Sequence, residues 1–236
     1  MVQLLRLIRN ESNQHALSRF IVYFATCACV DYFYRVLPSL FPQASFYSLH
    51  GHIPPAKRTL SLSSFVSHAS TPDSPSILLC TDVAARGLDL PNVDCVIQFD
   101  PPVDPKQFSH RCGRTARAGK EGKAWVLLTE KEEEYVGKSS LPNPSYAITL
   151  MLIFPLDFMT VRKIPLKKHS PFPPSPSTSS DIDDSGSLLQ RMRKVVREDR
   201  DLHERVCTMH PFTPDADWSF LGNESLRFVR PGVLQA

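Results

Sequence analysis

Long apolar runs are scarce in this sequence. The longest one outside the expected core, YAITLMLIFPLDF at Tyr146–Phe158, is too short to span a bilayer as a helix and contains Pro155. The first residues show no charged segment followed by a long apolar one. The sequence therefore predicts neither a membrane-spanning helix nor a secretory signal, and membranes are not expected among its partners.

Cysteine pairs of the kind that bind zinc are also lacking. The chain has six cysteines, and none forms a C-x2-C pair. Cys27 and Cys29 are separated by one residue and no second pair accompanies them, so the spacing predicts no metal site. Free thiols without a secretory signal fit a reducing compartment, the cytosol or the nucleus.

A strong charge of one sign is absent as well. The 27 Lys and Arg residues against 24 Asp and Glu residues give a formal net charge of +3, which does not by itself indicate a nucleic-acid partner. The sequence also lacks the G-x-x-x-x-G-K-[ST] loop that cradles nucleotide phosphates. Gly137-Lys138-Ser139 ends like this loop, but Glu132 stands at the position of its first glycine.

Residues 1–136 alternate between short apolar runs and helical patterns, which is typical of a parallel α/β sheet. Helices are expected around Leu4–Ile8, over Cys27–Leu37 with an end before Pro38, from Pro54 to about His68, and over Pro105–Cys112. Strands are expected at Phe20–Phe24, Ser45–Leu49, Ile77–Cys80, Cys95–Phe99 and Ala124–Leu128. Ligands of such sheets bind at the carboxyl ends of the strands.

The pattern changes after residue 136. Residues 137–160 read as an anomalous insertion, residues 161–186 as a basic and then Pro/Ser-rich linker, and residues 208–236 as an irregular tail. Between them, residues 187–207 predict a helix with an apolar stripe of Leu188, Met192, Val195, Leu202 and Val206. The extension is expected to be partly disordered with this one helix.

Two arginines follow a glycine in the string His110-Arg111-Cys112-Gly113-Arg114-Thr115-Ala116-Arg117-Ala118-Gly119. The planar guanidinium groups of Arg114 and Arg117 suit the charge that develops on a transferred phosphoryl group. The alternative is a solvated basic loop, which the length of the whole string disfavours.

Polar residues also follow three of the expected strands. Thr81 comes directly after one strand, where its hydroxyl can donate to a nucleic-acid phosphate, and Asp89 can accept from a ribose hydroxyl. The alternative is an ordinary loop with a capping aspartate. Thr26 and the pair His50-Gly51 follow two other strands, and each of these alone is more often a plain loop than a site.

Together these strings resemble a known family. Ile21–Thr26, Leu49–Arg58, Thr81–Asp89 and His110–Gly119 resemble motifs IV, IVa, V and VI of DEAD-box RNA helicases, in the second of their two RecA-like lobes. Ala25–Phe33, with Arg162–Leu166 and Arg200–His203, is similar to the nucleolar helicases that act in assembly of the large (60S) ribosomal subunit. Two positions depart from the family pattern, Pro55 for a glutamine and Ala116 for a glycine.

The resemblance implies a role for each matching residue. Arg114 and Arg117 would reach the γ-phosphate of ATP, and Asp89 would contact its ribose. His110 and Arg111 would bridge to the first lobe, and Thr26, Gly51 and Thr81 would hold RNA backbone. ATP with magnesium would be the cofactor of the complete enzyme. This chain would hold neither alone, because it has no phosphate-cradling loop and no D-E-A-D string after a strand.

The resemblance implies an ATP-dependent RNA helicase of rRNA processing and large-subunit biogenesis, in the nucleus and nucleolus. Its partners would be RNA, above all rRNA, the first RecA-like lobe and pre-ribosomal particles. The alternatives are a non-catalytic lobe that binds RNA or a partner, and an inactive fragment or faulty gene model. Residues 137–160 are either a retained intron translated in frame or a species-specific loop insertion.

Overall fold

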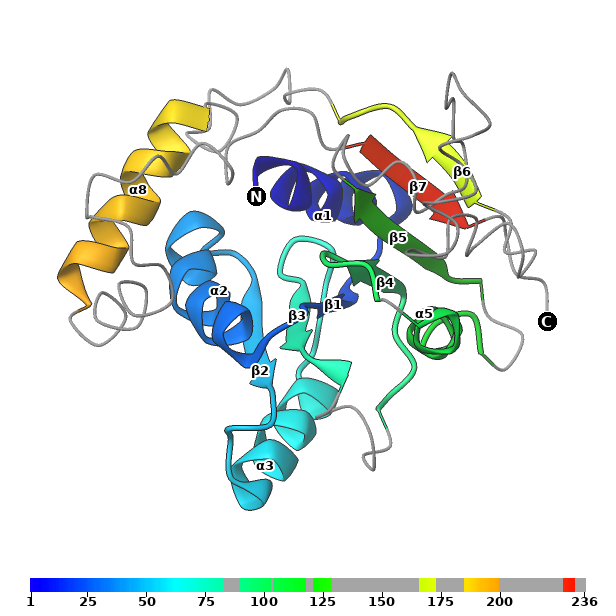
Figure 1. Ribbon diagram of the computed structural model, residues 1–236, viewed down its shortest axis with the longest axis horizontal. Helices are drawn as coiled ribbons and strands as arrows, with labels where there is room; N and C mark the ends of the chain where they lie inside the picture. Colours follow the sequence, from blue (N-terminus) through cyan, green and yellow to red (C-terminus); the bar gives the residue numbers. More distant parts are fainter. Residues whose placement is uncertain are drawn as a thin grey trace, which may run out of the picture.

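The computed structural model describes residues 1–82, 90–102, 104–117, 121–128, 166–172, 185–199 and 227–231. Five parallel strands form the centre of its sheet, in the order β2-β3-β1-β4-β5 (Figure 1). They are β1 (Arg19–Tyr23), β2 (Ser45–Leu49), β3 (Ser76–Cys80), β4 (Cys95–Gln98) and β5 (Lys123–Leu128). The parallel α/β sheet predicted from the sequence is confirmed.

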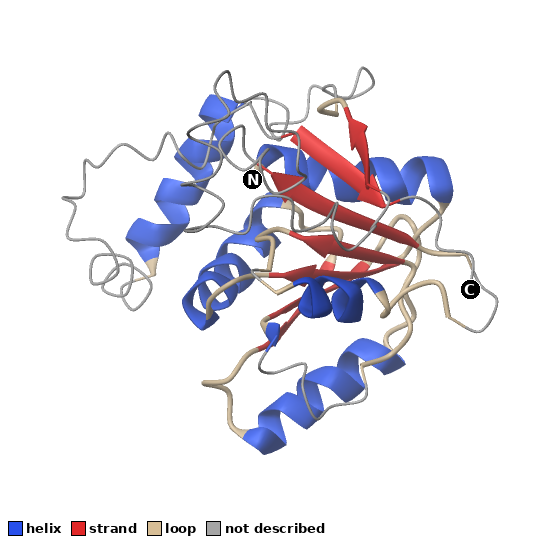
Figure 2. Cartoon of the chain, turned by 45° about the vertical axis from the view of Figure 1, so that its right-hand side comes forward, coloured by secondary structure: helices blue, strands red, loops and turns tan. Residues whose placement is uncertain are grey.

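Helices cover both faces of this sheet (Figure 2). They are α1 (Val2–His15), α2 (Cys27–Leu40), α3 (Pro55–Ser67) and α5 (Pro105–Cys112). Their starts follow from local chemistry: α3 and α5 begin at prolines, whose missing N–H costs nothing in the first turn. The side chain of Thr26 caps α2 by accepting from the amide of Cys29 at 3.1 Å, and Asp104 caps α5 in the same way.

The alternation of side chains along the strands divides the core in two. Phe20 and Val22 of β1 lie in the cluster that α1 and α2 cover, and Ile21 and Tyr23 lie in the cluster that α3 and α5 cover. Phe65 of α3 is fully buried in the second cluster. The sheet is thus apolar on both faces, as parallel sheets are.

The predicted end of α2 before Pro38 is wrong, because the helix continues to Leu40. A proline inside a helix removes the hydrogen bond to the carbonyl four residues earlier, here that of Tyr34. Tyr34 is 41% exposed, so this carbonyl belongs to the solvent side of the helix. Leu37 and Leu40 are fully buried, and their packing holds the last turn in helical form despite Pro38.

Two strands from the C-terminal part extend the sheet. β7 (Arg227–Pro231) pairs antiparallel with β5, and β6 (Leu166–His169) pairs antiparallel with β7. The sequence predicted neither, placing β6 in the linker and β7 in the irregular tail. β6 is the edge strand and β7 lies between β5 and β6. Strands as short as these are specified by the partners they pair with, and their own sequences carry little period.

The predicted C-terminal helix is present as α8 (Ser185–Glu198), which packs against α2 (Figure 1). Leu188, Met192 and Val196 are buried in the same cluster as α2, and Arg35 forms an ion pair with Asp199 at 2.9 Å. The buried face of α8 therefore includes Val196, whereas Val195, which was predicted to belong to it, is only partly buried. Leu202 and Val206 lie outside the described residues.

Residues 137–160 also lie outside the described part of the chain, so both interpretations of this segment remain predictions, as does the division of the chain into domains. Within the described ranges, no helix combines the length and the apolar character needed to cross a membrane.

Candidate nucleic-acid and nucleotide site

The three residues predicted to hold RNA backbone lie at one edge of the sheet. Thr26, Gly51 and Thr81 follow the carboxyl ends of β1, β2 and β3, which are neighbours in the order β2-β3-β1. The amide of Phe24 donates to the carbonyl of Cys80 at 2.9 Å, and the amide of Thr81 donates to the carbonyl of Leu49 at 3.2 Å. These bonds continue the ladders past the strand ends and bring the three loops together.

Gly51 lies against the start of α2. A methyl group placed at Gly51 would meet the Sγ atom of Cys27 at 3.9 Å, which is ordinary van der Waals contact. Cys27 is the first residue of α2 and follows the capping residue Thr26. Backbone at Gly51 and the capped helix start therefore form one continuous surface.

The hydroxyl of Thr81 is a buried polar group of this edge. Thr81 is 3% exposed, and its Oγ1 has no hydrogen-bond partner among the described residues. Leaving a buried hydroxyl unpaired costs about 1–3 kcal/mol. Such a group at a strand end is satisfied when a ligand supplies the partner, and a phosphate oxygen is a suitable acceptor.

Next to Thr81, Asp82 is bound by Arg111 of α5. The guanidinium of Arg111 donates from Nε and an Nη atom to the two carboxylate oxygens of Asp82, at 2.7 and 2.6 Å. It also donates to the Gln98 side chain at 3.3 Å and to the Asp100 carbonyl at 2.8 Å. The guanidinium carbon lies 4.9 Å from the centre of the Tyr23 ring, a cation–π contact.

The role predicted for Arg111, a bridge to another lobe, stays a prediction. Within this lobe its side chain is 3% exposed and ties α5 to the ends of β3 and β4. His110 is exposed on the same helix and has the freer position for contacts outside the lobe.

Burial sets the ionisation of the groups around Arg111. It raises the pKa of Tyr23 and of the Cys80 thiol above their ordinary values, and the charges of Arg111 and Arg114 counteract this only in part. Burial also raises the pKa of the Cys112 thiol to about 12, although the hydrogen bond from Gln98 lowers it. These groups are neutral near pH 7, and Arg111 and Asp82 are the charged pair among them.

The loop after α5 is held in place by Thr115. Its hydroxyl lies 2.7 Å from the carbonyl of Val93 and 3.0 Å from that of Asp94, just before β4. Ala116 has φ = 55°, in the left-handed region that favours glycine. This explains in physical terms why a glycine suits the position where this chain has alanine.

Arg114 and Arg117 project from this loop. Arg114 is half-buried, and its carbonyl accepts from the amide of Val93 at 3.1 Å. Arg117 is exposed, and its Nε donates to the carbonyl of Gly113. The anchored loop thus presents two guanidinium groups, and their predicted contact with ATP is not tested by this chain alone. Asp89, the predicted ribose contact, lies outside the described residues.

Sequence reasoning missed the residues that support the site. No role was predicted for Asp82, Gln98, Asp100 or Asp94. The carboxylate of Asp94 accepts from the backbone amides of Ser18 and Arg19, each at 2.9 Å. A polar residue at the end of a fully apolar strand is the signal that could have found Gln98 and Asp100.

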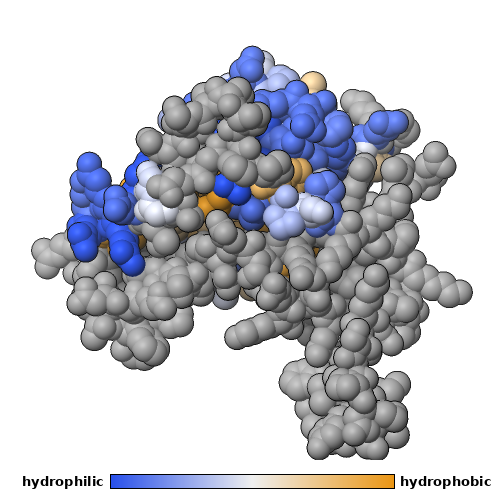
Figure 3. Space-filling model, turned by 90° about the horizontal axis from the view of Figure 1, so that it is seen from above, coloured by the Kyte–Doolittle hydropathy of each residue, from blue (hydrophilic) through white to orange (hydrophobic). Residues whose placement is uncertain are grey.

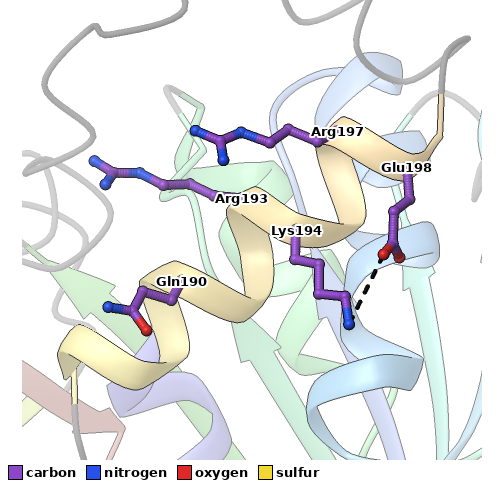
Figure 4. A pocket seen from close by; sticks show the side chains of 5 residues that line it. All are labelled: Gln190, Arg193, Lys194, Arg197 and Glu198. Atoms are coloured by element: carbon purple, nitrogen blue, oxygen red, sulfur yellow. Dashed lines mark ion pairs between the residues drawn. The ribbon is translucent and has the colours of Figure 1, made fainter.

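A second charged surface lies on α8, away from this edge. Gln190, Arg193, Lys194, Arg197 and Glu198 line a shallow groove there (Figure 4). Lys194 and Glu198 form an ion pair at 3.8 Å, while Arg193 and Arg197 point away from it. Seen from above, hydrophilic side chains gather at the left end of the molecule, where α8 lies (Figure 3).

These features define a RecA-like lobe of the helicase type, with a basic loop and a polar strand edge. Residues 1–119 match the model of the helicase conserved C-terminal domain, and the chain belongs to that family. The match ends within the string His110–Gly119 and so includes both arginines and the three strand ends.

The similar curated proteins are DEAD-box helicases. The chain is 46% identical over 215 residues to the ATP-dependent rRNA helicase SPB4 of Cryptococcus neoformans, an alignment that covers 87% of this chain and 29% of that protein. It is 40% identical over 169 residues to DEAD-box ATP-dependent RNA helicase 49 of Arabidopsis thaliana, covering 71% and 25%. The chain thus spans less than a third of the length of these relatives, and it is a DEAD-box C-terminal lobe.

A solved structure shares the fold. Mss116p DEAD-box helicase domain 2 bound to an RNA duplex aligns with a TM-score of 0.55 at 21% identity, covering 90% of this chain and 75% of that one. The likeness confirms the RecA-like architecture predicted for this chain.

Proposed function

We propose that this chain is the second lobe of an ATP-dependent RNA helicase of rRNA processing. Its strand edge binds RNA backbone, and its basic loop completes an ATP site on a first lobe. The observation that carries the RNA part is the buried hydroxyl of Thr81, which has no partner among the described residues. The hydroxyl is buried in the isolated chain, so RNA binding requires this part of the edge to open.

Backbone rather than base recognition fits the groups at this edge. A hydroxyl from Thr81, a capping hydroxyl at Thr26 and close backbone approach at Gly51 address phosphate and sugar, which carry no sequence information. Neighbouring strand ends present them side by side. The lobe should therefore bind RNA weakly, with strong salt dependence and little preference for sequence.

The basic loop fits a nucleotide. The planar guanidinium groups of Arg114 and Arg117 can each bind a phosphate in two places. Thr115 fixes the loop that carries them, so the two groups are positioned before the nucleotide arrives. ATP and magnesium, when bound between two lobes, supply the phosphoryl group and neutralise its charge. Asp89 is the proposed contact to the ribose, and His110 to the first lobe.

The proposal that rRNA is the substrate rests on the sequence similarity to helicases of known name. The relative from Cryptococcus neoformans is named an rRNA helicase, and Ala25–Phe33 of this chain resembles the nucleolar helicases of large-subunit assembly. We infer that the substrate is rRNA within pre-ribosomal particles and that the protein acts in the nucleolus.

One pair of substitutions tests the RNA site. Thr81→Val removes the hydroxyl and keeps the shape of the side chain, so it should weaken RNA binding while stability holds or rises. Thr115→Val removes a buried hydroxyl that is fully paired at 2.7 Å, so it should lower stability and leave RNA affinity unchanged. Fluorescence anisotropy with labelled single-stranded RNA gives the affinities, and urea unfolding gives the stabilities.

Two results would contradict the proposal. Equal RNA affinity of wild type and Thr81→Val would remove the hydroxyl from the site. Tight binding of one RNA sequence at physiological salt would show that bases are read, which the groups at this edge do not provide.

A further inference from the structure

A cysteine and two histidines meet at the start of α2. One ligand atom each from Cys27, His50 and His52 lies within 4.8 Å of the others. We propose that these three side chains form a binding site for a zinc-type transition metal ion. The cluster lies beside the proposed RNA contacts Thr26 and Gly51, but none of its three ligands is assigned to RNA or ATP, and its test involves neither.

The donor set selects the class of metal. A thiolate with two imidazoles is the ligand set of zinc and similar soft or borderline ions, whereas magnesium and calcium take oxygen ligands. Zinc–sulfur and zinc–nitrogen bonds of about 2.3 and 2.0 Å place tetrahedral ligand atoms about 3.5 Å apart. Atoms now within 4.8 Å need only small side-chain rotations to reach that spacing.

The backbone already holds the ligands together. Cys27 is fixed as the first residue of α2 by the Thr26 cap. His50 and His52 sit in a turn closed by a hydrogen bond from the Ile53 amide to the His50 carbonyl at 3.1 Å. A methyl group at Gly51, between them, would come into contact with the Cys27 sulfur. The exposed His52 already lies beside the buried His50, with the two ring centres 6.0 Å apart.

A carboxylate supports the buried histidine. Asp31 Oδ1 lies 2.9 Å from His50 Nε2. Histidines that bind metals usually present their second nitrogen to such a carboxylate, which fixes the tautomer and the ring orientation. With hydrogen on Nε2, the Nδ1 lone pair of His50 faces the metal, and water completes the fourth position. This carboxylate is one turn of α2 beyond Cys27.

The sequence spacing could not reveal this site. Its ligands come from the start of α2, which follows β1, and from the turn after β2, and the parallel topology brings these two segments to the same edge of the sheet on either side of β3. The expectation of no metal site rested on paired cysteines. In the structure Cys27 pairs with histidines, and the nearby Cys29 is not part of the cluster.

Cobalt substitution tests the proposal directly. The full chain carrying Cys207→Ser, which removes a thiol outside the described residues, is stripped of metal and titrated with Co²⁺. One equivalent should give a thiolate charge-transfer band in the near ultraviolet and intense visible bands of tetrahedral cobalt. Zn²⁺ should displace the cobalt and abolish the bands.

Matched variants assign the ligands. Cys27→Ser should abolish the charge-transfer band, while Cys29→Ser, a half-buried cysteine on the same helix, should keep it. His52→Ala should weaken cobalt binding strongly, while His15→Ala, another exposed histidine, should not. Asp31→Asn should weaken it by about 10- to 100-fold, the range for partners that support a ligand. Circular dichroism confirms that each variant is folded.

Absence of the bands in folded protein would overturn the proposal. Bands that survive Cys27→Ser, or that disappear equally in Cys29→Ser, would do the same by placing the metal elsewhere. Because RNA and nucleotide are absent from the assay, failure here leaves the proposed function untouched.

Discussion

Arg111 holds Asp82 through both carboxylate oxygens, at 2.7 and 2.6 Å, across the carboxyl edge of the sheet. The Arg111 side chain is 3% exposed and that of Asp82 is 22% exposed, so water screens the pair weakly. The pair joins α5, which leads into the arginine loop, to the residue that follows Thr81. One ion pair therefore connects the proposed nucleotide loop to the proposed RNA edge.

Asp82→Asn should lower the free energy of unfolding by about 3 kcal/mol, because it leaves the Arg111 cation buried without its counter-charge. Arg111→Lys should also destabilise, since an ammonium cannot donate to both carboxylate oxygens in a planar fork. Urea unfolding followed by circular dichroism measures both.

The pair between Arg35 and Asp199 is the matched control. Its side chains are 30% and 34% exposed, so Asp199→Asn should cost less than about 1 kcal/mol. If Asp82→Asn cost no more than this control, the buried pair would not be what holds α5 to the strand ends.

The backbone of the arginine loop gives a second prediction. Ala116→Gly should raise the free energy of unfolding by about 0.5–1 kcal/mol, because glycine adopts φ = 55° without the strain that alanine has there. Ala16→Gly, at the C-cap of α1 with φ = 54°, should give a gain of similar size. A loss of stability in both variants would contradict the left-handed conformation.

The same loop should not tolerate a side chain at Gly122. An added Cβ there would clash with Thr115 Oγ1 and with the Ala116 amide nitrogen. Gly122→Ala should therefore destabilise the protein by more than about 2 kcal/mol, because the anchored loop must move away from β4. A crystal structure or an unfolding curve indistinguishable from wild type would show that the loop is not anchored as described.

The strands and helices that could be predicted from the sequence are those that neighbouring residues in the chain specify. The buried strands were readable because Phe20–Phe24 and Ile77–Cys80 are continuously apolar, and helix starts were readable at Pro55 and Pro105. The helix end predicted from Pro38 is wrong because the burial of Leu37 and Leu40, which no local pattern measures, overrides the local preference of proline.

The parts of the site that were not predicted all depend on contacts between residues far apart in the sequence. Asp82 and Arg111 come from different motifs, and only the strand order makes them partners. Cys27 and His50 likewise meet because β1 and β2 flank β3. The strand β7 pairs with β5 across a large separation in sequence, which its own five residues cannot encode.

Stability should fall at alkaline pH. Burial raises the pKa of the Cys112 thiol from 9.0 to about 12, so the unfolded chain releases this proton before the folded one does. The protonated Cys112 thiol contributes fully to the free energy of unfolding below about pH 9. This contribution is lost as the pH rises toward 12, at up to about 1.4 kcal/mol per pH unit. Tyr23 and Cys80, whose pKa values burial also raises, act in the same direction.

Urea unfolding at pH 7.5, 9 and 10 measures this slope. Cys112→Ala should make it shallower, because one of the titrating groups is gone. An unchanged slope in Cys112→Ala would mean that the thiol ionises equally in the folded and unfolded chains.

The proposed arginine contacts lead to the last prediction, made on the chain joined to a first lobe of a DEAD-box relative. Arg114→Ala should lower RNA-stimulated ATP turnover by about 10³-fold or more, because a guanidinium that meets the charge of the transition state is lost. RNA affinity without nucleotide should stay the same, since the strand edge with Thr81 is unaltered. Arg193→Ala on α8, an arginine away from the loop, is the control and should leave turnover unchanged. Equal losses of turnover and of nucleotide-free RNA affinity in Arg114→Ala would make Arg114 an RNA contact, and the arginine loop would then belong to the RNA edge.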